Sequence, residues 1–68
     1  MRPNLKKARH EKGLTQKQVA EEIGISVHMY VAIERGKRVG NVRTWDKLQD
    51  LLELDQRTLR ATDIKEAV

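Results

Sequence analysis

Apolar residues along this chain recur three and four positions apart, which is the spacing of short amphipathic helices. No stretch alternates apolar and polar residues for the length of a strand. Local start and stop signals divide the helical pattern into five segments. The first is predicted over about 3–12, because Pro3 suits a first helical turn and Gly13 suits a stop. Leu5 and Ala8 share the apolar face of this segment.

The second segment has the clearest boundaries. Thr15 and Gln18 have the spacing of a capping box, in which each side chain bonds the other residue's backbone N–H. Gly24 suits the left-handed conformation that ends many helices. These signals predict a second helix over about 16–23.

Each of the remaining helices follows a residue that caps helices well. Ser26 precedes a third helix over about 27–35, and Asn41 precedes a fourth. A fifth short helix begins at Asp55 and buries Leu59, and residues 62–68 fray or extend it. The inward stripe of the fourth helix is formed by Trp45, Leu48, Leu51 and Leu52. The predicted fold is therefore all-α, a compact bundle of five short helices around one core.

Composition narrows the class of protein. With 68 residues the chain is one small domain, which leaves little volume for a substrate pocket and counts against an enzyme. Its apolar runs are far shorter than the ~20 residues of a membrane span, and we expect no membrane partner and no secretory signal. The absence of cysteine excludes thiolate chemistry and suits a reducing cytoplasm, where we expect the chain to act.

Charge is unevenly distributed along the chain. Residues 1–43 hold ten basic and four acidic side chains, whereas residues 44–68 hold four basic and six acidic ones. A polyanionic partner for the basic portion is the natural inference, either nucleic acid or an anionic surface. Charge alone is equally compatible with a solvated surface that has no partner.

Two short helices joined by a glycine-containing turn describe a helix-turn-helix. The stretch LTQKQVAEEIGIS at 14–26, followed by IERGKR at 33–38, resembles the phage repressor and Cro family, also called XRE-type. The resemblance implies a lambda-repressor-like DNA-binding domain over 5–59. Its helix-turn-helix motif covers about 16–35, and residues 60–68 form a short C-terminal extension.

The resemblance also implies roles for individual residues. Bases are read by Val27, His28 and Ala32, on the outward face of the third helix in the major groove. The DNA backbone is contacted by Gln16, Lys17, Ser26, Lys37, Arg38 and Arg43. Arg9 and Glu34 match a structural ion pair between the first and third helices. The residue types agree: Gln16 lies at a helix N-terminus that favours phosphate, and His28 can donate to guanine.

Other chemistry is missing from the sequence. His10 and His28 are too far apart for a metal-ligand spacing, and the scattered glycines form no phosphate-binding loop. We therefore expect no cofactor, no metal, no small-molecule ligand and no catalytic residue.

The favoured function is a sequence-specific transcriptional regulator that binds double-stranded DNA as a homodimer, with repressor preferred to activator. Helix five and the acidic C-terminal portion are the expected dimer surface, with candidates Leu54, Leu59 and Ile64. The alternative is a protein-interaction module, such as an antitoxin that also binds DNA. Co-purification with a partner protein would distinguish the two.

Overall fold

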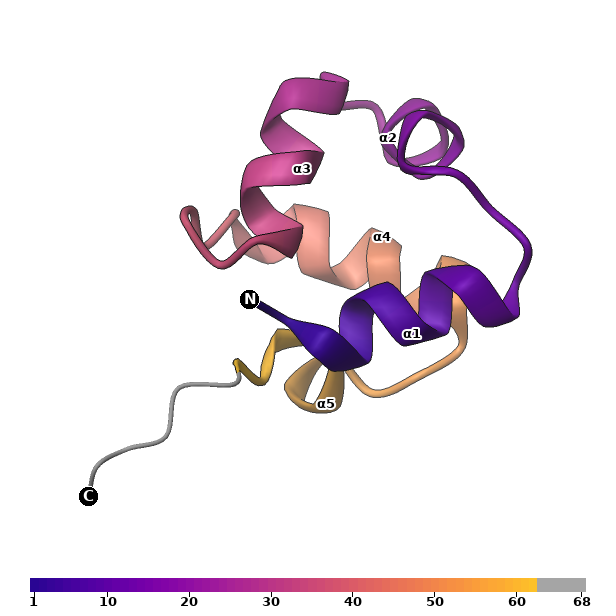
Figure 1. Cartoon of the computed structure of the whole chain (residues 1–68), viewed down its shortest axis with the longest axis vertical. Coiled ribbons are helices and arrows are strands. Elements are labelled where there is room, and N and C mark those ends of the chain that lie inside the picture. The colour runs from indigo at the N-terminus through magenta and orange to yellow at the C-terminus, as the bar shows by residue number, and fades with distance from the viewer. Residues whose placement is uncertain (63–68) are drawn as a thin grey trace.

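Five α-helices follow one another in the computed structural model, which describes residues 1–62. They are α1 (Pro3–Glu11), α2 (Gln16–Ile23), α3 (Val27–Glu34), α4 (Val42–Leu52) and α5 (Gln56–Arg60). The helices α2 and α3 form one end of the molecule and α1 and α5 the other, with α4 between them (Figure 1). The predicted all-α class is confirmed, and within residues 1–62 there is no strand. The predicted continuation of helix five past residue 62 falls on 63–68, outside the described residues.

The helix starts agree with the capping residues of the sequence. In the box before α2, the Gln18 N–H donates to Thr15 Oγ1 at 3.0 Å, and the Thr15 N–H donates to Gln18 Oε1 at 2.8 Å. Ser26 Oγ accepts from the Met29 N–H at 3.1 Å before α3, and Asn41 Oδ1 accepts from the Thr44 N–H at 2.8 Å before α4. Each such cap stabilises a helix by about 1 kcal/mol.

Two helix ends differ from the prediction by one residue. The first helix ends at Glu11 instead of residue 12, and the third at Glu34 instead of residue 35. Lys12 and Arg35 keep right-handed backbone angles as C-caps, and the glycines that follow have positive φ. The two glycines therefore do mark the ends of these helices, but each lies two residues after the last helical residue.

The core is a single cluster with contributions from all five helices. Its largest members are Trp45 of α4 and Tyr30 of α3, and Leu59 of α5 is fully buried among them. The prediction of Leu59 as a dimer-surface residue is therefore wrong, because its side chain is already used by the core of its own chain. Leu54 is 39% exposed and remains accessible, whereas Ile64 lies outside the described residues.

The end of α4 contains the only non-glycine residue with positive φ among residues 1–62. Glu53 is the C-cap, and its φ of 57° places it in the left-handed region. Its carboxylate pairs with the Lys12 ammonium at 2.8 Å on the surface. The backbone of a residue with a Cβ is strained in this conformation, so Glu53 lowers the stability of the folded state.

We expect Glu53→Gly to raise the melting temperature by about 4 °C, because glycine adopts this conformation without strain. Thermal unfolding followed by circular dichroism measures the effect. Glu53→Ala is the matched control: it also removes the Lys12 pair but keeps the Cβ, and a surface pair contributes little. Equal melting temperatures for the two variants would show that the backbone at this position is not strained.

Candidate nucleic-acid interface

The helices α2 and α3 form a tight pair around a short turn. Gly24 has a φ of 79°, and its N–H and that of Ile25 both donate to the Ala20 carbonyl, at 2.9 and 3.0 Å. Ala20 is buried, and its small side chain permits close approach of the two helices. Ile25 is half-buried against the core, which fixes the turn. The outward face of α3 is thus held on a rigid support.

Beneath this pair lies the buried carboxylate of Glu34, which joins three helices. Arg9 of α1 donates its Nε–H to Glu34 Oε2 at 2.8 Å, and the Tyr30 hydroxyl of α3 donates to the same oxygen at 2.9 Å. Gln16 of α2 donates from Nε2 to Oε1 at 2.9 Å. The structure therefore brings Arg9 and Glu34 together and adds two partners that sequence reasoning did not assign.

These contacts shift the pKa values of the groups involved. Burial acts to raise the pKa of Glu34, but the hydrogen bonds from Arg9, Gln16 and Tyr30 outweigh it and hold the pKa below its ordinary value. The hydrogen bond to Glu34 raises the pKa of Arg9. Burial, followed by the charge of Glu34, raises the pKa of Tyr30. The network at neutral pH is therefore a carboxylate, a guanidinium and a neutral phenol.

Gln16 is placed at the start of α2, as predicted, but its amide faces inward to Glu34. Its Nε2 atom has two hydrogens, and the bond to Glu34 uses one of them. The side chain is half-buried, so it reaches the surface only in part. Any contact with a phosphate would thus come from an amide whose orientation Glu34 sets.

The candidates for base reading lie on α3 with different degrees of exposure. Val27 is 37% exposed and His28 is also exposed, both in the first turn of the helix. Ala32, one turn further on, is half-buried, as are Met29 and Val31. The first turn of α3 is therefore the part of the helix most open to a ligand.

The candidates for backbone contact, apart from Gln16, are exposed in the structure. They comprise one residue of α2, the N-cap of α3, two of the α3–α4 loop and one of α4: Lys17, Ser26, Lys37, Arg38 and Arg43. Ser26 already accepts a hydrogen bond as a cap, and its second lone pair and hydroxyl hydrogen remain for other partners.

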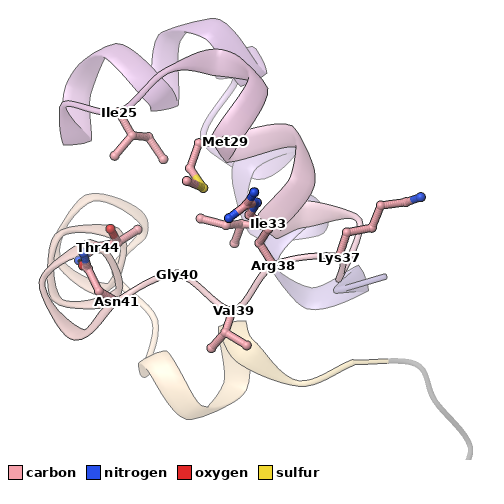
Figure 2. Close-up of a pocket in the computed structure, with 9 residues that line it drawn as sticks. All are labelled: Ile25, Met29, Ile33, Lys37, Arg38, Val39, Gly40, Asn41 and Thr44. Carbon is pink, nitrogen blue, oxygen red and sulfur yellow. Dashed lines mark hydrogen bonds between the residues drawn. The ribbon is translucent and has the colours of Figure 1, made fainter.

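A groove of about 580 Å³ runs between α3 and the start of α4. Figure 2 shows Ile25, Met29 and Ile33 on one side of it and Asn41 and Thr44 of α4 on the other. The α3–α4 loop closes its lower side, contributing Lys37, Arg38, Val39 and Gly40. An apolar wall, the Arg38 guanidinium and the N-terminus of α4 therefore meet at one surface depression, whereas the Lys37 side chain points away from it (Figure 2). Such a combination suits a ligand with anionic groups along an extended backbone.

Arg2 is a buried residue next to this site that sequence reasoning missed, since it was counted only among the basic side chains. It is 5% exposed, and its guanidinium lies over the Trp45 ring at 5.3 Å from the centroid. It is the N-cap of α1 but makes no side-chain cap. No local sequence signal indicates this burial, because every partner of the guanidinium comes from a distant segment.

Other kinds of site are not seen in the described part of the chain. Among residues 1–62 no three or more side chains of the metal-ligating types gather at one place. None of the helices in this range has the length and apolar character needed to cross a membrane.

A family model described as helix-turn-helix matches residues 5–59. The chain is also similar to an uncharacterized HTH-type transcriptional regulator, YqaE, of Bacillus subtilis (strain 168), with 37% identity over 51 residues, or 75% of this chain. The aligned part spans only 44% of that relative's length. No solved structure matches the chain.

The Glu34 network predicts that Arg9→Met destabilises the protein by about 3–5 kcal/mol, because a buried carboxylate loses its cation. Urea unfolding measures the loss. The double variant Arg9→Met/Glu34→Leu removes both charges and should regain most of it. A double variant no more stable than the single one would show that the pair does not act as a unit.

The lowered pKa of Glu34 predicts a pH dependence of stability. Unfolding restores the ordinary carboxyl pKa of 4.5, so the unfolded state binds the proton more readily and this stabilisation is lost as pH falls below that value. The acid limb of a plot of unfolding free energy against pH should flatten in Glu34→Gln. Glu53→Gln, at an exposed ion pair, is the control and should leave the limb nearly unchanged. Equal acid limbs for Glu34→Gln and the parent would contradict the assignment.

Proposed function

The chain belongs to the XRE-type helix-turn-helix family, and on this basis we propose that it is a sequence-specific DNA-binding transcriptional regulator. The observation that supports this most directly is the exposed first turn of α3, with Val27 and His28, on a helix whose other end leads into the exposed cations of the α3–α4 loop. A helix of this kind fits the major groove of B-DNA.

In this proposal α3 reads the base edges. His28 donates to a guanine acceptor, and Val27 meets a thymine methyl group. Ala32 is half-buried, so it reads a base only where the groove wall comes close to α3. The first turn therefore provides most of the sequence preference.

The DNA backbone lies along the groove between α3 and α4. Arg38 and Lys37 bind its phosphates from the loop, and Arg43 does so from the first turn of α4, where the helix dipole also favours an anion. Ser26, Gln16 and Lys17 bind the phosphates on the other side of α3. These contacts position the protein and carry no sequence information of their own.

The DNA-binding unit in this proposal is the segment 5–59, with its motif at 16–35 and residues 60–68 as an extension. Two copies bind half-sites about 34 Å apart, and the protein acts as a repressor by occupying the operator. Exposed Leu54 belongs to the proposed dimer surface. The chain contains no cysteine, which agrees with a cytoplasmic location.

Selection of bound duplexes from a random pool tests the proposal. We expect the parent protein to enrich one symmetric motif, and His28→Ala to relax the preference at one base pair per half-site by about 1–3 kcal/mol. Direct binding measurements on duplexes changed at that base pair give the magnitude.

Arg38→Ala is the matched control for His28→Ala. It should keep the same motif, weaken all sequences about equally and reduce the slope of log affinity against log salt by about 0.9. A pool with no enriched motif, or one that His28→Ala leaves unchanged, would contradict base reading by α3.

A further inference from the structure

Arg2 makes a set of long-range contacts that the proposed function does not use. Its Nη1 donates to the carbonyls of Ile33 at 2.6 Å and Arg38 at 3.0 Å, and its Nε donates to the carbonyl of Arg60 at 3.0 Å. Its own backbone N–H donates to the Glu34 carbonyl at 2.8 Å. One side chain therefore joins the end of α3, the α3–α4 loop and the end of α5.

The chemistry of these partners explains how a cation can be buried here. The carbonyls of Ile33 and Arg60 belong to the last turns of α3 and α5, where the helix dipole favours positive charge. The Ile33 carbonyl accepts a second hydrogen bond, from the Gly36 N–H at 3.0 Å. Burial, and next the nearby Arg60, lower the pKa of Arg2. The oxygens and the Trp45 ring face replace the lost water, so the guanidinium is held in a defined position.

The α3–α4 loop is held by a second hydrogen bond at Val39, the residue after Arg38. The Trp45 indole Nε1–H donates to the Val39 carbonyl at 2.6 Å. A Cβ built on Gly40 would stand 3.1 Å from Ile33 Cδ1 and 3.3 Å from Trp45 Nε1, so the backbone lies close against the core. Two successive carbonyls, those of Arg38 and Val39, thus point inward and are bonded. Fixing these peptide planes also fixes the direction in which the exposed Arg38 side chain leaves the backbone.

We propose that Arg2 is a positioning residue for DNA binding: it holds the α3–α4 loop so that Arg38 meets a backbone phosphate, without touching DNA itself. The proposal rests on the proposed function. Arg2 is 5% exposed and its donors face carbonyl oxygens, so it does not contact DNA directly. Its effect on affinity must therefore pass through the loop.

The test compares the parent with Arg2→Met, Arg2→Lys and the core control Leu59→Val, with any tag placed at the C-terminus. Met1 lies against Gly36, where a built Cβ would be 2.8 Å from the Met1 nitrogen, which is why the N-terminus is left unaltered. All affinities are measured on the selected duplex at a temperature where circular dichroism shows each variant to be folded. If Arg2→Met does not fold, Arg2→Lys, which keeps the charge but loses the planar fork, takes its place.

We expect Arg2→Met to bind about tenfold more weakly, the change expected from one charge-assisted hydrogen bond, and to reduce the salt slope by about 0.9. Arg2→Lys should have an affinity and a salt slope between those of Arg2→Met and those of the parent. Leu59→Val should keep the parent's salt slope, because it loosens the core without touching the loop. In the Arg2→Met background, Arg38→Ala should lower the affinity for the duplex by less than about a further twofold, because Arg38 has already lost its phosphate contact.

A readout without DNA completes the test. Trypsin cleavage after Lys37 and Arg38, followed by mass spectrometry, should be faster in Arg2→Met than in the parent, and not faster in Leu59→Val. Additive effects of Arg2→Met and Arg38→Ala with an unchanged salt slope would overturn the positioning role. If instead Arg38→Ala leaves the parent's DNA binding unchanged, the proposed phosphate contact of the loop is itself wrong.

Discussion

The buried carboxylate of Glu34 is the interaction on which the arrangement of the first three helices depends. A charge away from water is tolerated only when its oxygens are fully bonded, and here donors come from α1, α2 and α3 itself. The geometry of all three helices is therefore tied to two oxygen atoms. Because Gln16 is one of the donors, the same carboxylate orients a residue at the start of α2 that is proposed to contact the DNA backbone.

Arg2 plays a corresponding part at the same, C-terminal, end of α3, where it donates to the carbonyls of Ile33 and Glu34. Its partners are backbone carbonyls instead of a counter-ion, and they belong to segments far apart in the sequence. The last turn of α3 is thus held by two buried charges, an anion with side-chain donors and a cation with main-chain acceptors. In a domain with a small core, these two buried charges add directional constraints that apolar packing alone does not provide.

The sequence alone was sufficient to predict features that depend on hydrogen bonds between residues close together in the chain. Thr15 with Gln18, Ser26 and Asn41 bond to backbone within three residues of themselves, so the starts of α2, α3 and α4 could be predicted to the residue. The candidates on α3 and in the loop came instead from the resemblance to the phage repressor and Cro family. Features that depend on tertiary packing could not be read in this way. Leu59 was predicted both as a buried residue of the fifth helix and as a dimer-surface candidate, and only its burial is confirmed. Arg2 was counted only among the basic side chains, because none of its partners is near in sequence.

The hydrogen bond from Arg2 to Arg60 spans almost the whole described chain, and Asn4 Nδ2 makes a second such link to the Thr58 carbonyl at 3.2 Å. Folding must therefore close a loop of nearly the full domain before these contacts form. On the ribosome, α1 emerges first but cannot complete its packing until α5 has also left the tunnel. The packing of α1 against α5 is consequently completed only after α2, α3 and α4 have been synthesised.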